Sequence, residues 1–241
     1  MRPKLVFCGP TLPPGDRPDE AGLVFLPPAL QGSFLHAVKR YDPQAILLID
    51  GGFQSGPAVR HKEILWTIGR GIPVLGAASM GALRAAELAP YMQGFGLIYR
   101  WYRRFPLTPD DAVAVLHGPA EVNFAPVTDA LVDLRRTIRR ALRTGRIAAE
   151  TCRVLDDVAR GLNFRDRRLD RVVSEAFPGE AGNAVRAALT QSLTQQKRMD
   201  ALVALAALRG GTYSQSPKLQ GMPLTRVFAS ELEDAGWPSS H

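Results

Sequence analysis

Pro73-Val74-Leu75-Gly76-Ala77-Ala78-Ser79-Met80-Gly81-Ala82-Leu83-Arg84-Ala85-Ala86-Glu87-Leu88 is the stretch of sequence that decides the fold. It begins as a short apolar run, passes through a turn of small residues, and continues as a segment of high helix propensity. A strand that leads at once into a helix is the building unit of an α/β sheet. Ser79 falls at the switch, so we expect it at or near the N-cap of the helix.

The residues before this stretch repeat the alternation of strand and helix. Apolar runs at 4–8, 22–27 and 45–50 predict strands, and the segments 33–41 and 58–69 predict helices. We therefore predict an α/β fold, Rossmann-like or flavodoxin-like, with a mainly parallel sheet and a C-terminal helical domain.

The second half of the chain differs from the first, because it is predicted to be mainly helical. Val113, Val115 and the following Gly118-Pro119 favour a short strand within residues 110–117. Helices are then expected one after another, at 128–144, 148–160, 166–176, 181–195 and 197–208. We predict three parts: an α/β core domain at 1–125, a helical domain at 126–210, and a tail at 211–241 that is extended or disordered because it is rich in Ser, Pro and Gly.

The composition is that of an ordinary globular protein. With 241 residues, of which 46% are hydrophobic and 22% charged, the chain is long enough for one sizeable core with an attachment. No apolar run approaches the roughly 18 residues of a membrane span, and the run at 5–8 is too short for a signal sequence. Cys8 and Cys152 alone give no disulfide framework, and the scattered histidines predict no metal. A cytoplasmic setting is expected.

The net charge of +7 is concentrated in the second half of the chain, between Leu134 and Arg171. No aromatic residues are interleaved with these arginines and no nucleic-acid-binding motif accompanies them, so nucleic acid is not the expected partner. An acidic protein partner or a solvated helix face fits better. The candidate partner-binding residues are Arg135, Arg136, Arg139, Arg140 and Arg143.

Three unusual loops follow predicted strands. In a right-handed parallel sheet such loops gather at the carboxyl edge, where ligands of these folds bind. A helix that follows a strand starts at the same edge, so we expect His61 to point inward near Ser79 and Asp50. The candidate substrate or anion-binding residues of the loops are Gly9, Pro10, Thr11, Gly51, Gly52, Met80 and Gly81.

Ser79 is the candidate nucleophile, because Ala77-Ala78-Ser79-Met80-Gly81 is an Ala variant of the G-x-S-x-G elbow. The backbone N–H groups of Met80 and Gly81 would face an anion or a developing oxyanion. His61 is the candidate general base and Asp50 the group that orients it. The alternatives stay open: the turn packs a helix on the sheet, His61 is a core residue, and Asp50 caps the next turn.

Four further residues are weaker candidates for the same edge. Lys62 and Glu63 flank His61 and form either part of the site or a solvated pair, while His117 follows the predicted strand at 110–117. Cys8 closes the first strand and would either hold sulfur as a persulfide or be a buried, inert thiol.

Several of these motifs together resemble the TfuA-like family. They are Val6 to Leu12, Ile49 to Phe53, His61 to Trp66, Gly76 to Leu88 and Val113 to Glu121. The resemblance covers residues 4 to about 122 in order, and the string from Gly76 to Leu88 is its most specific part.

The resemblance implies a role beside a YcaO-type protein, which activates a backbone amide with ATP so that sulfur replaces the amide oxygen. The TfuA-like partner would supply or release the sulfur from a sulfide donor or a thiocarboxylated sulfur-carrier protein, and would meet the peptide substrate through the YcaO-type partner. No cofactor of its own is expected, since no G-x-x-x-x-G-K-[ST] loop is present and ATP is assigned to the partner. The alternatives are a non-catalytic scaffold or activator of the YcaO-type protein, and a free-standing serine hydrolase.

Overall fold

A computed structural model describes residues 2–52, 56–217, 219 and 224–238 of the chain. The chain divides into two compact units. The first contains residues 1–106 and 200–241, and the second contains residues 107–199. The sequence predicts boundaries at 125/126 and 210/211, whereas the two units meet at 106/107 and 199/200. The second unit is therefore inserted within the first.

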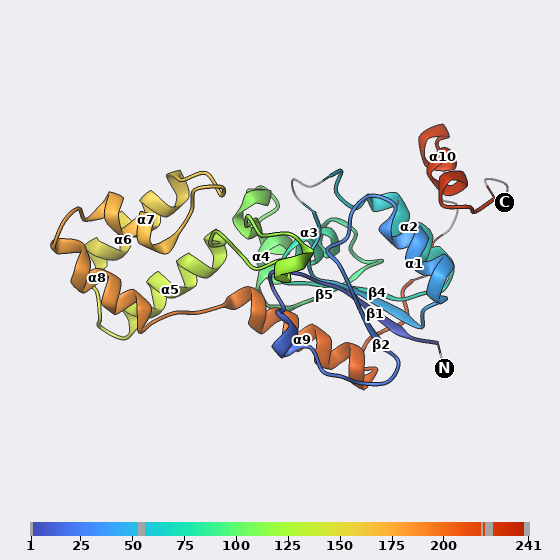
Figure 1. Cartoon of the computed structure of the whole chain (residues 1–241), viewed down its shortest axis with the longest axis horizontal. Helices are drawn as coiled ribbons and strands as arrows, with labels where there is room; N and C mark the ends of the chain where they lie inside the picture. The colour runs from blue at the N-terminus through green and yellow to red at the C-terminus, as the bar shows by residue number, and fades with distance from the viewer. Residues whose placement is uncertain (1, 53–55, 218, 220–223, 239–241) are drawn as a thin grey trace. The chain divides into compact units, whose positions relative to one another are not determined.

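The first unit is built on a parallel sheet of five strands (Figure 1). Its strands are β1 (Lys4–Phe7), β2 (Leu23–Leu26), β3 (Ala45–Leu48), β4 (Val74–Ala77) and β5 (Gln93–Phe95). The strand order is β2-β1-β3-β4-β5 and every neighbouring pair is parallel. This is the order of the flavodoxin-like sheet, in which the chain reverses direction between β1 and β3. The predicted α/β class is therefore confirmed.

Both faces of the sheet are buried, as the almost continuous apolar character of β1, β3 and β4 requires. The helices that connect successive strands all run in one direction across the sheet, so right-handed crossovers place them on one face. They are α1 (Ser33–Tyr41), α2 (His61–Gly69) and α3 (Met80–Glu87). Phe7 of β1 stacks on Phe34 of α1 across this face, with ring centroids 5.1 Å apart.

The opposite face is covered by α9 (Gln196–Gly210), a helix from far along the chain (Figure 1). The connection from β1 to β2 runs the other way across the sheet, and its regular structure is one short 3-10 turn, η1 (Pro14–Asp16). Ala201, Ala204, Leu205 and Leu208 fill the face that this connection leaves, packing on β1, β3 and β4. The sequence pattern placed this helix in the helical domain, because periodicity does not reveal what a helix packs against.

A strand and the α-helix that follows it, both within residues 1–106, were not predicted. They are the edge strand β5 and the helix α4 (Gly96–Arg104) that follows it. Asp200 of α9 holds the start of α4, because its buried carboxylate accepts a hydrogen bond of 2.7 Å from the Ile98 N–H. An acidic side chain at a helix N-terminus also complements the helix dipole.

The tail contains a helix, α10 (Arg226–Asp234), where an extended or disordered segment was expected. Its Phe228 and Leu232 pack on Leu35 of α1, and the rings of Trp237 and Trp66 lie 5.0 Å apart. Thr225 caps the helix N-terminus. The burial of these side chains explains why a short polar helix persists here. Residues 218, 220–223 and 239–241 of the predicted tail lie outside the described residues.

The second unit is helical. Its α-helices are α5 (Leu131–Arg143), α6 (Ala149–Gly161), α7 (Leu169–Ala176) and α8 (Ala181–Thr190). Residues 110–117 do not form the predicted strand: Asp110–Val113 is a 3-10 turn, η2, and His117 pairs with Pro126 in an isolated bridge. A second 3-10 turn, η3 (Ala120–Val122), follows.

A buried arginine ties this unit together. Arg167, 1% exposed, pairs with Asp111 at 2.9 Å and donates to the carbonyl oxygens of Ala159 and Leu162. A guanidinium buried with several acceptors satisfies its donors without leaving a lone buried charge. In the described part of the chain, no helix has the length and apolar character that crossing a membrane requires.

Replacing Gly81 by Ala should destabilise the protein, because the added Cβ would lie 1.8 Å from the Leu48 carbonyl oxygen of β3. Overpacking of this kind usually costs about 1–3 kcal/mol, and backbone atoms have little freedom to move away. Urea unfolding followed by circular dichroism measures the change.

Gly161→Ala is the matched control, because a Cβ added at this residue would have no atom within 4 Å and the residue ends α6. It should be neutral or stabilising by up to about 1 kcal/mol. Equal unfolding midpoints for the two variants would contradict close packing of α3 on β3.

Candidate functional site

The loops after β1 and β3 meet at the carboxyl edge of the sheet. The Asp50 carboxylate, which is 2% exposed, accepts hydrogen bonds from the Gly9 N–H at 2.8 Å, the Thr11 N–H at 3.0 Å and the Thr11 hydroxyl. Gly9, Pro10 and Thr11 are thus fixed beside Asp50 at the point where the strand order reverses. Asp50 positions this loop, and its hydrogen-bond partners do not include His61.

Gly51 and Gly52 continue the loop after β3 and join it to two other segments. Gly52 donates to the Ala29 carbonyl at 2.9 Å, and a Cβ on Gly51 would lie 2.8 Å from the Met80 side chain. The loop therefore contacts the first residue of α3. Phe53, the last residue of the motif that starts at Ile49, lies outside the described residues.

Ser79 sits in a strained turn between β4 and α3. Its N–H donates to the Ala77 carbonyl at 2.8 Å, and Ala78 between them has φ of 66°. A bond between residues two apart with a positive φ at the centre is the rare, strained form of γ-turn. Such strain persists only where the surrounding structure enforces it, and it concentrates at functional sites.

The Ser79 side chain is the N-cap of α3 by position, as predicted, but it accepts no capping hydrogen bond from the helix. The residue is 9% exposed. The hydroxyl is therefore not used to satisfy the helix N-terminus, which is the usual task of serine there.

The two N–H groups expected to form an oxyanion site differ. The Gly81 N–H donates to the Ile49 carbonyl at 3.1 Å, so it is taken by the sheet and is not available to a ligand. The Met80 N–H has no acceptor among the residues that the structure describes. One backbone donor, together with the dipole of α3, faces the site beside Ser79.

The prediction that His61 points inward is wrong. Its side chain is 46% exposed and its Nε2 lies 2.8 Å from a Glu87 carboxylate oxygen. Glu87 is about two turns, or roughly 12 Å of helix axis, beyond Ser79 in α3. His61 is the first residue of α2, and the buried face of this helix, which includes Ile64 and Ile68, does not include it.

Glu87 joins His61 to Arg84. Arg84, which lies three residues before Glu87 in α3, is 2.6 Å from the same carboxylate oxygen. Partial burial acts to raise the pKa of Glu87, but the hydrogen bonds and charges of His61 and Arg84 outweigh it and lower the pKa below its usual value. This carboxylate therefore stays ionised and holds the His61 ring away from Ser79.

Lys62 and Glu63 have separate tasks. Lys62 donates to the Thr225 hydroxyl at 2.9 Å, which links α2 to the start of α10. Glu63 is buried, 1% exposed, and accepts from the backbone N–H groups of Arg60 and of Gly32 and Phe34 at the start of α1. Glu63 thus joins two helix N-termini. The alternative that Lys62 and Glu63 form a solvated pair is wrong, because Glu63 is buried.

His117 belongs to the second unit. Its Nδ1 lies 2.8 Å from the Gly118 carbonyl oxygen, and its ring meets Phe124 edge to face, with centroids 5.7 Å apart. These contacts fit a residue that stabilises the bend between His117 and Pro126.

The arginines of α5 do not form one uniform surface. Arg135 is paired with Asp156 at 2.7 Å, and the Nε of Arg136 is buried without a partner among the described residues. Arg140 donates to the Leu193 carbonyl at 3.2 Å, whereas Arg139 and Arg143 are exposed. Arg139, Arg140 and Arg143 are thus the members of the predicted set that a partner can reach.

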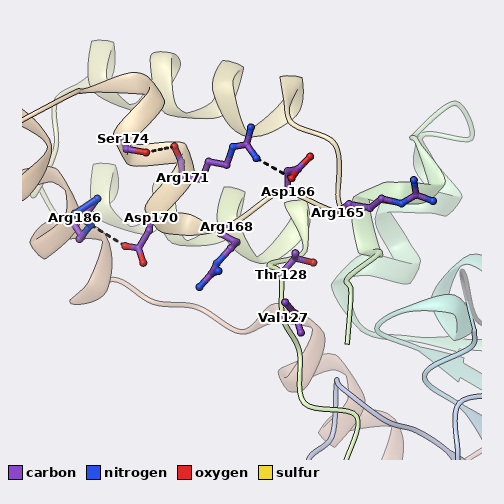
Figure 2. A pocket seen from close by; sticks show the side chains of 9 residues that line it. All are labelled: Val127, Thr128, Arg165, Asp166, Arg168, Asp170, Arg171, Ser174 and Arg186. Atoms are coloured by element: carbon purple, nitrogen blue, oxygen red, sulfur yellow. Dashed lines mark hydrogen bonds and ion pairs between the residues drawn. The ribbon is translucent and has the colours of Figure 1, made fainter. Parts of the chain in front are cut away.

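A hollow of about 530 Å³ in the second unit was not predicted (Figure 2). It is lined by Val127, Thr128, Arg165, Asp166, Arg168, Asp170, Arg171, Ser174 and Arg186. The run of charged residues from Arg165 to Arg171 is the feature of the sequence that could have indicated this hollow. The position of Arg186 beside it depends on the packing of α8 against α7 and has no sequence signature.

The two cysteines and the acidic groups make no metal site. Burial raises the pKa of the Cys8 thiol to about 12, so it stays neutral and has little nucleophilic or metal-binding character. Across the described residues, no three side chains of His, Cys, Asp or Glu come together as metal ligands.

Comparison with protein families gives a match over about half of the chain. Residues 50–168 match the model of a family described as TfuA-like protein. The matched range starts at Asp50, includes the Ser79 turn and α3, and ends just before α7. No curated protein matches the chain.

Alkylation should distinguish the two cysteines. Iodoacetamide applied to the native protein is expected to modify Cys152, which is partly exposed, and to leave the buried Cys8 unmodified until the chain is unfolded. Mass spectrometry of tryptic peptides measures the result, and Cys152→Ser should show no native labelling. Rapid native labelling of Cys8 would mean that the first strand is accessible.

Glu63 should make the stability depend on pH. Burial raises its pKa from 4.5 to about 7, against the opposing effect of the three N–H donors. Between these values the folded protein keeps a proton that the unfolded chain has lost, so the stability is highest below the unfolded pKa and falls as pH rises toward the folded pKa. The fall attributable to Glu63 is about 3 kcal/mol.

Urea unfolding at a series of pH values tests this, with Glu63→Gln as the comparison. The variant should have a weaker dependence on pH in this window, because the titrating group is gone. Parallel curves for the two proteins would contradict the raised pKa.

Proposed function

Because this chain belongs to the TfuA-like family, we propose that it works beside a YcaO-type enzyme in forming backbone thioamides on ribosomally made peptides or proteins. Its task is to supply sulfur, by releasing it from a thiocarboxylated sulfur-carrier protein. The YcaO-type enzyme uses the ATP and holds the peptide substrate.

The Ser79 turn is the observation that carries this proposal. It combines a strained γ-turn, a hydroxyl that does not cap its helix, and the Met80 N–H at a helix N-terminus. The loop of Gly9 to Thr11, held by Asp50, lies at the same edge. The Ser79 hydroxyl and the Met80 N–H offer hydrogen bonds to the acyl group at the end of a carrier tail and to the oxyanion that forms when this group is attacked, whereas the donors of Gly9 and Thr11 are taken by Asp50.

Sulfur release is then a hydrolysis. Water attacks the thiocarboxylate carbon, a new C–O bond forms, and the C–S bond breaks. The carrier ends as a carboxylate, sulfide leaves as HS⁻, and one proton passes to solvent. In this proposal Ser79 and Met80 stabilise the oxyanion and orient the acyl group, and Asp50 acts as a positioning residue for the facing loop.

A second candidate function is non-catalytic activation of the YcaO-type enzyme. It is favoured by the contacts of His61 with Glu87 and of Asp50 with Gly9 and Thr11, which leave Ser79 without the base that a Ser-His-Asp centre needs. The same contacts argue against a free-standing serine hydrolase.

Reconstituted thioamidation separates these functions. With purified YcaO-type enzyme, ATP and an acceptor peptide, this chain should be required when a thiocarboxylated carrier supplies the sulfur and dispensable when free sulfide does. Ser79→Ala should lower the carrier-dependent rate about 100-fold or more, the usual effect of removing one oxyanion donor. Thioamide product is measured by mass spectrometry.

Ser214→Ala, which changes an exposed serine in the same unit, is the control and should be as active as the parent protein. A requirement for the chain with both sulfur sources, unaffected by Ser79→Ala, would replace sulfur release by activation of the partner.

A further inference from the structure

The hollow beside α7 has the size of a ligand site. Its volume of about 530 Å³ falls within the range of roughly 300–1,000 Å³ that small-molecule and cofactor pockets occupy. That is far more room than one bound ion needs. Its walls come from the segment before α5, the start of α7 and Arg186 of α8, all within the second unit (Figure 2).

Positive charge prevails in this hollow. Four arginines line it, against two aspartates. Arg171 pairs with Asp166 and Arg186 with Asp170, each at 2.9 Å. These pairs are solvent-exposed, so they are worth about 1 kcal/mol or less and are readily exchanged for a competing carboxylate.

Arg168 has no ion pair among the residues that the structure describes. It is the N-cap residue of α7, and its backbone is extended there. Figure 2 shows its side chain directed away from α7, between the Arg171–Asp166 and Arg186–Asp170 pairs. A guanidinium in this position offers its planar fork of N–H donors to an anion, with the positive end of the α7 dipole close by.

The chemistry of the walls selects the kind of anion. The described lining residues include no aromatic ring on which a base could stack, and Asp166 and Asp170 repel a continuous run of phosphates. A peptide with separate carboxylates avoids this repulsion. Val127, 55% exposed, and Thr128 provide a partly apolar wall for its remaining atoms.

We propose that this hollow is a binding site for an acidic peptide segment, with Arg168 and Arg186 as the residues that hold its carboxylates. The site lies in the helical unit and shares no residue with the sulfur-release proposal. It therefore stands whether or not the chain serves a YcaO-type enzyme.

Fluorescence anisotropy on the full chain tests the site. The probe is a fluorescein-labelled Gly-Glu-Gly-Glu-Gly peptide, and the reference is Gly-Gln-Gly-Gln-Gly with the same label. The acidic peptide should bind and the neutral one should not. Arg168→Gln and Arg186→Gln should each weaken binding about tenfold or more, since each removes a charge-assisted hydrogen bond.

Arg153→Gln is the matched control. It removes one exposed arginine of the same unit, which pairs with Glu150, and it should leave the affinity unchanged. A photo-crosslinking version of the probe should attach near Val127, Thr128 or Ser174. Circular dichroism confirms that each variant is folded.

Three results would overturn the proposal. They are the absence of binding by the acidic peptide, an equal loss of affinity in Arg153→Gln, which would indicate general attraction to a basic protein, and crosslinks confined to other parts of the chain. Displacement of the probe by oligo(dT) at lower concentration than by unlabelled acidic peptide would assign the hollow to nucleic acid instead. Failure of carrier-dependent thioamidation would leave the proposal unaffected.

Discussion

The contact between the backbones of α3 and β3 is the constraint on which the rest of the first unit depends. Gly81 has room for no side chain, because the Leu48 carbonyl oxygen occupies the place of a Cβ, and its N–H is bonded to the Ile49 carbonyl. A helix held this close to the sheet must begin immediately after β4. The chain achieves this with the strained turn at Ala78, which is what leaves Ser79 and the Met80 N–H at the carboxyl edge.

The same edge shows how a polar group can be essential without being catalytic. Asp50 is buried because it has three donors from Gly9 and Thr11, and it would be destabilising without them. Glu63 is likewise buried because it joins the N-termini of α1 and α2. Both carboxylates were candidates for chemistry. In the folded chain the oxygens of Asp50 already hold the Gly9–Thr11 loop, and those of Glu63 hold the starts of α1 and α2.

The sheet also explains the division of the chain. The β1–β2 connection carries no α-helix, so the face on its side must be covered by another segment, and α9 covers it after the chain has completed the second unit. Each unit has its own candidate site: the hydrogen-bond donors at the Ser79 turn in the first, and the arginine-lined hollow in the second. A sulfur-release site and a peptide-binding site are therefore separate hypotheses, each with its own variants.

The sequence by itself determined the α/β class, the strand-to-helix switch at Ser79 and the loops that meet beside it, because hydrophobic periodicity and turn residues act over a few neighbouring positions. It also carried the resemblance to the TfuA-like family. Only the tertiary structure decided that His61 pairs with Glu87, that α9 covers the sheet, that α10 packs on α1, and that Arg186 joins the arginines of α7. These features depend on contacts between segments far apart in the chain, and the direction of a side chain at the end of a helix depends on which charges the rest of the fold brings to it.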